Sequence, residues 1–390
     1  MHVVIMGLGI AGFSACQAIR KNDPDIAISV ISDESILYYY RPRLIDFLAS
    51  KAKIESLITK KIKWYEENRI ALFLNKKVNS IIASKRQISL SDGNVLEYDK
   101  LLIATGANSF IPPVCGINNA NIFTWRDYSD SVQIKEIAKK SRACLVLGGG
   151  LLGLEAANSL SALGLKVFVV EIMNRLMPKQ LDEYGAQVLE NLLEKRNIEF
   201  ILGKSAKNIE ALSGNRLACE LSDGNCLDVD FILVSAGVRA RVDLANNCGI
   251  NTDKAIIVNE KMETSIKDIY AAGDCTEFNG KPCGIFPIAK AQGEIAGLQM
   301  SSENVIYEEV IPSTKLKVAG IDLVSFGNID ADEKYESICV KKEGLYKKLV
   351  LENSIPIGAI MLGDLGGNSE ISEAINKKER NDSIINKYFR

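Results

Sequence analysis

The sequence predicts an α/β protein with two parallel-sheet domains of one design, the second inserted into the first, and a small α+β domain after them. Three observations support this fold class. A strand, a glycine-rich loop and a helix follow one another twice; a third glycine-bearing strand end comes after the second copy; and beyond residue 305 short alternating strands take over. The 390 residues, 47% hydrophobic and 25% charged, suit two or three packed domains.

The two glycine-rich loops define the repeated unit. The apolar run Val3–Met6 leads into Gly7–Gly12 and a helical stretch, and Cys144–Leu147 leads into Gly148–Gly153 in the same way. Each is followed by another β run, at residues 26–31 and 166–170. Both copies are therefore βαβ units of the Rossmann type.

Later repeats set the domain limits. A Ser-Asp-Gly-Asn turn precedes a buried strand ending in glycine at residues 91–107 and again at 222–237, and the strand end at 269–274 reads as the chain returning to the first domain. We expect strands in the last domain at residues 315–318, 323–326, 347–351 and 357–362. The predicted domains are residues 1–108 with 238–305, then 109–237, then 306–390.

Composition excludes several classes of function. A net charge of −2 argues against a nucleic-acid partner, and no apolar run reaches the length of a membrane span. The nine cysteines lack the spacing of a zinc or iron–sulfur site, which predicts no bound metal and a reduced, cytoplasmic setting. His2 is the single histidine, so a histidine base or histidine metal site is excluded.

Each loop has the pattern G-x-G-x-x-G, which lets backbone amides and a helix N-terminus approach a pyrophosphate. One such loop alone is as consistent with a packing turn, but two in their βαβ context predict two dinucleotide sites. The candidate residues are Gly7, Gly9, Ile10, Ala11 and Gly12 in the first loop and Gly148, Gly150, Leu151, Leu152 and Gly153 in the second.

An acidic residue about 20 positions after each loop is expected to bind a ribose. Glu171 ends the strand after the second loop, where its charge would oppose a 2′-phosphate, so NADH is favoured over NADPH. After the first loop Ser32, Asp33 and Glu34 all remain candidates. The alternative for Glu171 is a solvated strand-end carboxylate.

The motifs Gly7–Gly12, Ala104-Thr105-Gly106, Gly148–Glu155, Gly237 and Gly273-Asp274 together resemble the two-dinucleotide flavoproteins of the pyridine nucleotide–disulfide oxidoreductase superfamily. The resemblance implies FAD in the first domain, NADH in the second, and Asp274 on the ribityl chain. The alternative for Asp274 is a turn aspartate.

The branch of this superfamily is indicated by residues 36–45. Pro42 stands where disulfide reductases and peroxidases carry a redox cysteine, and Ile10 where the peroxidases carry a histidine. The pattern Tyr-x-Arg-Pro-x-Leu around Arg41 instead resembles the branch that reduces rubredoxin or other iron–sulfur carriers. Residues 313–322 and 358–364 are similar to NADH:rubredoxin reductases and to the flavin part of nitrite reductase large subunits.

Further site assignments rest on the resemblance. It places Arg126 on the FAD phosphates, Val78 at adenine, and Arg41, Glu155 and Lys317 near the flavin. The alternatives are a surface ion pair for Arg126, a plain strand residue for Val78, a helix-face carboxylate for Glu155 and an exposed lysine for Lys317.

The resemblance implies an FAD-dependent NADH:rubredoxin oxidoreductase, with hydride passing to flavin N5 and single electrons to the carrier. No side chain is expected to be a covalent catalyst. The alternatives are an NADH oxidase, a flavoprotein component of a nitrite or ferredoxin reductase system, and a non-enzymatic flavoprotein. Residues 41–63, the basic segment, carry seven basic residues against two acidic ones and are expected to attract a small acidic carrier; a merely solvated face is the alternative.

Overall fold

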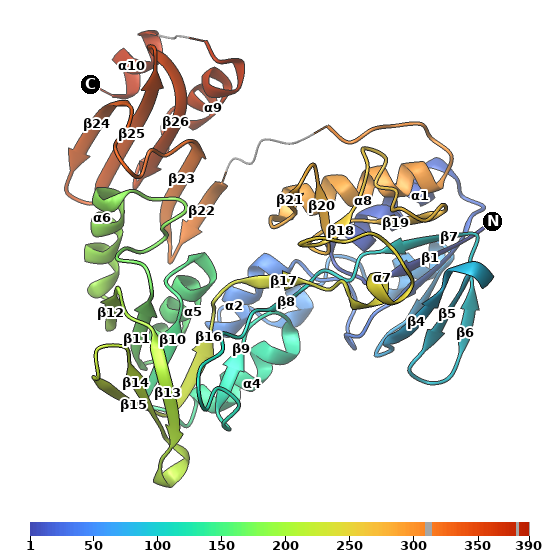
Figure 1. Cartoon of the computed structure of the whole chain (residues 1–390), viewed down its shortest axis with the longest axis horizontal. Helices are drawn as coiled ribbons and strands as arrows, with labels where there is room; N and C mark the ends of the chain where they lie inside the picture. Colours follow the sequence, from blue (N-terminus) through green and yellow to red (C-terminus); the bar gives the residue numbers. More distant parts are fainter. Residues whose placement is uncertain (309–313, 380–381, 390) are drawn as a thin grey trace. The chain divides into compact units, whose positions relative to one another are not determined.

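The computed structural model describes residues 1–308, 314–379 and 382–389 (Figure 1). It consists of two compact units, each formed from separate stretches of chain. The first unit contains Met1–Arg43, Ala52–Asn108 and Val238–Val310, and the second contains Leu44–Lys51, Ser109–Gly237 and Ile311–Arg390.

The first unit is built on a five-stranded parallel sheet with the order β19-β7-β1-β2-β3. Its strands are β1 (His2–Met6), β2 (Ala27–Ile31), β3 (Ile70–Phe73), β7 (Lys100–Ile103) and β19 (Ile269–Ala271). The central strands are almost wholly apolar and buried, as expected for a parallel sheet covered on both faces. Helix α1 (Ile10–Asn22) packs against α8 (Phe286–Met300).

The second unit contains a parallel sheet of the same design, with the order β12-β11-β10-β16-β9. Its strands are β9 (Ile122–Thr124), β10 (Ala143–Leu147), β11 (Lys166–Glu171), β12 (Ile198–Leu202) and β16 (Phe231–Val234). Strands β10, β11, β12 and β16 take the places that β1, β2, β3 and β7 hold in the first unit. The predicted pair of Rossmann-like folds is therefore confirmed.

Shorter elements complete the two units. In the first they are α3 (Ile62–Glu67), α7 (Asp243–Asn247) and the small sheets β4 (Val78–Ile82), β5 (Gln87–Leu90), β6 (Val95–Glu97) and β18 (Ile256–Ile257), β20 (Thr276–Phe278), β21 (Lys281–Pro282). In the second they are α2 (Leu44–Leu48), α4 (Tyr128–Ala138), α5 (Leu151–Ala162), α6 (Glu183–Glu194) and the sheet β13 (Ala206–Ala211), β14 (Leu217–Leu221), β15 (Cys226–Val229). Strands β8 (Ala107–Ser109) and β17 (Val238–Ala240) pair where the chain passes between the units.

The C-terminal part of the second unit is an antiparallel sheet with two helices, as the α+β expectation requires. The sheet order is β22-β23-β26-β25-β24. Its elements are β22 (Thr314–Val318), β23 (Ile321–Gly327), β24 (Glu336–Lys342), β25 (Leu345–Glu352), β26 (Ile355–Leu362), α9 (Asn368–Lys377) and α10 (Asp382–Tyr388). The edge strand β24 was not expected from the sequence.

Helix α6 joins this C-terminal sheet to the parallel sheet of the second unit. Apolar side chains from both sides form one cluster, which includes Leu181, Leu189 and Leu362. Within it lies a buried polar group, here called the junction network: Asp182 accepts hydrogen bonds from the Tyr346 hydroxyl at 2.7 Å and pairs with the Lys348 ammonium at 3.2 Å. The C-terminal sheet is thus attached through both apolar packing and a buried ion pair.

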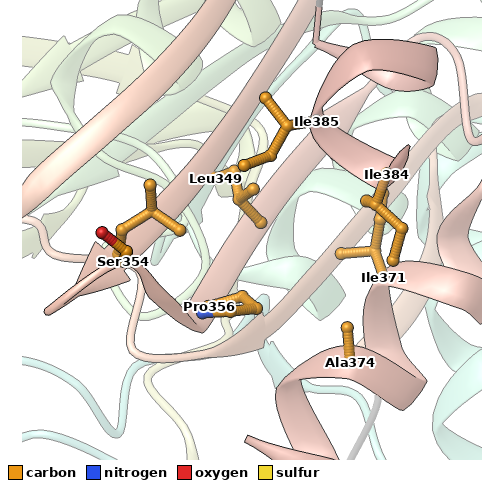
Figure 2. A pocket seen from close by; sticks show the side chains of 8 residues that line it. Leu349, Ser354, Pro356, Ile371, Ala374, Ile384 and Ile385 are labelled. Atoms are coloured by element: carbon orange, nitrogen blue, oxygen red, sulfur yellow. The ribbon is translucent and has the colours of Figure 1, made fainter. Parts of the chain in front are cut away.

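A small cavity lies under β25 and β26, against α9 and α10 (Figure 2). Its volume is about 10 Å³, and its walls are mostly aliphatic, including Leu349, Ile371 and Ile384. A cavity of that volume holds at most one water and offers few polar partners. It is therefore a packing gap in the C-terminal core.

Candidate dinucleotide sites

The first glycine-rich loop turns the chain from β1 into α1. Gly7 has φ +110°, and a Cβ there would lie 2.2 Å from the Ala104 carbonyl oxygen, so only glycine fits. A Cβ on Gly12 would lie 2.0 Å from the Gly7 carbonyl oxygen. Gly9, in contrast, has no atom in reach of its missing Cβ, and no side chain caps α1. The outer side of the loop therefore offers backbone N–H groups to an anion.

The second loop repeats this geometry between β10 and α5. Gly148 has φ +122°, with its missing Cβ 2.3 Å from the Ser235 carbonyl oxygen, and a Cβ on Gly153 would lie 2.0 Å from the Gly148 carbonyl oxygen. Gly150 faces open space. Leu151 and Leu152 begin the helix that follows, as Ile10 and Ala11 do in α1.

A cavity of about 440 Å³ lies in the first unit, at the carboxyl end of its parallel sheet. Four of the predicted residues line it together: Gly7, Asp33, Val78 and Thr105. They follow β1, β2 and β7 or begin β4, and this edge of a parallel sheet is where dinucleotides bind.

The three ribose candidates after β2 differ in the contacts that they already make. Glu34 accepts hydrogen bonds from the Tyr39 hydroxyl at 2.6 Å and the Arg41 guanidinium at 2.5 Å. The buried Ser32 hydroxyl accepts from the Glu34 N–H at 3.2 Å. Asp33 alone of the three lines the cavity. We therefore favour Asp33 for the ribose contact.

Glu171, the corresponding residue of the second unit, is 8% exposed at the end of β11. Its Oε2 accepts from the Gly149 N–H at 2.7 Å, and its Oε1 accepts from the Met173 N–H at 2.8 Å. These bonds fix the carboxylate beside the second glycine loop.

Two further motifs follow strands of the first sheet. Ala104-Thr105-Gly106 follows β7, and Gly273-Asp274 follows β19. The Gly273 N–H donates to the buried Gln292 amide oxygen at 2.9 Å, and a Cβ on Gly273 would lie 3.0 Å from the Ala11 Cβ. Gly273-Asp274 therefore lies next to the start of α1.

Glu155 projects from α5 and is 7% exposed. The Ala319 N–H donates to its Oε1 at 3.2 Å. Burial raises the pKa of Glu155 from 4.5 to about 7, although the Ala319 contact acts in the opposite direction. This carboxyl can therefore hold or release a proton near neutral pH.

The other predicted residues are not brought into the cavity of the first unit. Arg41 and Pro42 lie in a short 3-10 helix, Arg41–Arg43, in which Arg41 is half-buried and Pro42 exposed. Gly237 has φ +100° before β17, and Arg126 precedes α4 in the second unit. Lys317 lies in β22, and its side chain is outside the described residues. Their roles remain predictions.

Most of the cavity lining was not anticipated. It adds Met6, Ile31, Lys76, Lys77, Asn79, Asn108, Arg241, Asp243, Leu244 and Asn247. Lys76, Lys77 and Arg241 lie in connecting segments, and the others lie in β1, β2, β4, β8 and α7 outside the predicted motifs. Arg241 contacts a residue 208 positions away. No local sequence pattern could have found them.

The basic segment is largely exposed. Lys51, Lys53, Lys61 and Lys63 are exposed, while Lys60 lies over the Trp64 ring at 5.7 Å. The segment is divided between the units, because residues 44–51 belong to the second.

All nine cysteines are free, and most are buried. Burial raises the pKa of Cys16 to about 12 and of Cys219 to about 11, and raises that of Cys283 as well. Cys115, Cys226 and Cys339 are exposed.

Comparison with known sequences and structures identifies the class. The pyridine nucleotide-disulphide oxidoreductase family matches residues 1–300, and the rubredoxin NAD+ reductase C-terminal domain matches residues 312–379. The chain belongs to the pyridine nucleotide-disulphide oxidoreductase family.

Particular relatives narrow the comparison. The chain is 32% identical over 384 residues to NADH-rubredoxin oxidoreductase of Clostridium acetobutylicum, covering 98% of this chain and 96% of the relative. The crystal structure of NADH:rubredoxin oxidoreductase from that organism superposes with a TM-score of 0.84 at 30% identity, covering 99% of both chains. The chain is also 32% identical to nitrite reductase [NAD(P)H] of Bacillus subtilis, covering 97% of this chain but only 47% of that protein.

Proteins of this family use FAD and NAD(H), and the residues present fit both. Each loop combines glycines whose close approaches exclude a Cβ with a glycine that faces open space, the form needed to hold a pyrophosphate. Among residues 1–308, 314–379 and 382–389, no helix is long and apolar enough to cross a bilayer, and no cluster of three metal-ligand side chains occurs.

Proposed function

We propose that this protein is an FAD-dependent oxidoreductase that oxidises NADH and reduces rubredoxin or a similar small acidic iron–sulfur carrier. The observation that carries the proposal is the similarity along nearly the whole of both chains to an NADH-rubredoxin oxidoreductase. The match of residues 312–379 to a rubredoxin reductase domain supports it.

The proposed division of labour follows the domains: FAD with residues 1–108 and 238–305, NADH with 109–237, and an interface domain at 306–390. Bound FAD would supply the link between the two-electron chemistry of NADH and the one-electron chemistry of the carrier. The protein binds and orients the two dinucleotides. The glycine loops hold the pyrophosphates, and Asp33 and Glu171 accept hydrogen bonds from ribose hydroxyls. Glu155, on the helix that follows the second loop, holds or releases a proton.

The proposal assigns no role to a thiol. A nucleophilic cysteine must be a thiolate, and burial opposes that form in Cys16 and Cys283. The position expected for a redox cysteine holds Pro42. Alkylation of the exposed cysteines should leave turnover with a carrier intact. Nine free cysteines also support a reducing compartment, and we place the protein in the cytoplasm.

The test is a steady-state assay of the purified protein, loaded with FAD, with NADH as donor. Rubredoxin, ferredoxin, nitrite, oxygen and a disulfide are compared as acceptors. Rubredoxin is expected to give the highest kcat/KM. If NADH is oxidised as fast with oxygen as the only acceptor as it is with rubredoxin, the protein is an NADH oxidase. Flavin reduction by NADH without turnover of any acceptor would indicate a non-enzymatic role.

A second candidate is the flavoprotein component of a nitrite or ferredoxin reductase system. The chain is similar to nitrite reductase [NAD(P)H] of Bacillus subtilis, of which it spans about half. A carrier preference for ferredoxin over rubredoxin in the same assay would favour this candidate.

A further inference from the structure

A guanidinium stands at the edge of the cavity in the first unit. Arg241, 34% exposed, follows β17 and lines the cavity together with Asp33. Its Nη1 donates to Oδ2 of Asp33 at 2.9 Å, and its Nε donates to Oδ1 of Asn108. Its backbone N–H donates to the Gly106 carbonyl oxygen at 3.0 Å. Two side-chain bonds and one backbone bond therefore fix the position of Arg241.

Those bonds connect the cavity with the two strands that cross between the units. Asn108 is the last residue of the first unit before the chain leaves it, and the chain returns at Val238. Strands β8 and β17, which contain these residues, pair with each other. Arg241 therefore ties the paired crossover strands to the segment after β2.

The contact between Arg241 and Asp33 changes the charge that the cavity presents to a dinucleotide. A dinucleotide carries a negatively charged pyrophosphate, which an uncompensated carboxylate on the same cavity would repel. Pairing with Arg241 compensates the charge and leaves Oδ1 of Asp33 without a hydrogen bond to any described residue. The Lys76 ammonium, also in the lining, is 2.9 Å from Asp92 and so is already paired.

We propose that Arg241 is a positioning residue for FAD: it holds Asp33 ready to accept from a ribose hydroxyl, cancels its charge, and slows flavin release by fixing the crossover strands. The proposal rests on FAD as the occupant of this cavity. It concerns a residue that neither glycine loop nor any neighbouring motif points to.

The test measures FAD release from the full-length FAD-loaded protein, through the fluorescence of the freed flavin. Arg241→Ala should speed release about tenfold, since charge-assisted hydrogen bonds are lost. The matched control is Arg86→Ala, which removes an arginine paired with Asp268 at 2.5 Å in the same unit but away from the cavity lining. The control should release FAD within twofold of the unaltered protein.

A second substitution separates positioning from packing. Because Arg241 acts through Asp33, adding Asp33→Asn to Arg241→Ala should recover at least half of the lost retention on a logarithmic scale. The melting temperature of the flavin-free protein should be the same with and without Arg241→Ala. A release rate unchanged by Arg241→Ala, no recovery from Asp33→Asn, or an equal fall in melting temperature without flavin would each overturn the proposal.

These results are distinct from a failure of the proposed function. If the unaltered protein retains no FAD, the flavoprotein assignment itself fails. If it retains FAD and Arg241→Ala retains it equally, the assignment stands and the role of Arg241 is refuted.

Discussion

The junction network makes a quantitative prediction about how the C-terminal sheet is held. Lys348 is 2% exposed, and its ammonium is 3.2 Å from Asp182 and 2.9 Å from the Asp330 carbonyl oxygen. Asp182 also accepts from the Tyr346 hydroxyl and, as the N-cap of α6, from the Gly185 N–H at 2.9 Å. Replacing either charged partner leaves the other as an unpaired charge inside an apolar cluster.

The size of the effect follows from what remains. In Lys348→Met, Asp182 keeps two neutral donors, so the loss of unfolding free energy should fall at the low end for a broken buried pair, about 3 kcal/mol. In Asp182→Asn the ammonium keeps only a carbonyl oxygen and faces an amide, which should cost about 4 kcal/mol. The double variant leaves no unpaired buried charge. Its loss of unfolding free energy should therefore be about 2 kcal/mol smaller than the sum of the two single losses.

Urea unfolding measures these costs if it reports the second unit alone. The chain has two tryptophans, Trp64 in the first unit and Trp125, which is 3% exposed, in the second. A Trp64→Phe background leaves Trp125 fluorescence as the signal. The control is Lys334→Met, which breaks an ion pair whose partners are 70% and 71% exposed and should change stability by less than about 0.5 kcal/mol. Equal effects of Lys348→Met and the control, or strict additivity in the double variant, would refute the reasoning.

Three further predictions concern the candidate sites. The pKa of Glu155 rises from 4.5 to about 7 on folding, so the native state binds the proton more strongly than the unfolded state. The free energy of unfolding should therefore fall as the pH rises from about 4.5 through 7. In Glu155→Gln, unfolding midpoints measured from pH 5 to 8 should show a smaller decline. Glu171 should make kcat/KM for NADH at least about tenfold higher than kcat/KM for NADPH. Glu171→Gln should reduce this preference for NADH. Equal kcat/KM for the two nucleotides in the unaltered protein would contradict the role of Glu171. The double variant Lys53→Glu, Lys61→Glu should reduce rubredoxin several-fold more slowly at low salt, with a weaker salt dependence. The rate at which NADH reduces the flavin should not change. An unchanged rate of rubredoxin reduction would show that the basic segment does not attract the carrier.

The repeated fold could be predicted because its signals are local. Each glycine loop carries its own strand, turn and helix within about 30 residues, so neighbouring residues suffice to recognise it. Strand β24 was missed because Glu336–Lys342 is a mostly exposed, charged edge strand, in which only Ile338 and Val340 alternate toward the core.

The candidate site likewise contains some residues that the sequence could predict and others that it could not. The family resemblance assigned Gly7, Val78 and Thr105 to one FAD site, and all three line the cavity of the first unit. The choice of Asp33 over Ser32 and Glu34 rests on the cavity lining, and Asp33 is paired with Arg241, which lies 208 positions away in the sequence. Pairing over such distances leaves no periodic trace in the sequence.

The distribution of thiols allows a spectroscopic experiment without engineering. The exposed cysteines, Cys115, Cys226 and Cys339, all belong to the second unit. In the first unit Cys16, Cys275 and Cys283 are buried, and Cys248 is half-buried. A maleimide dye applied briefly to the native protein would therefore mark the second unit, while flavin in the first serves as an intrinsic chromophore. Energy transfer between the two would follow the distance between the units through a catalytic cycle in the unaltered chain.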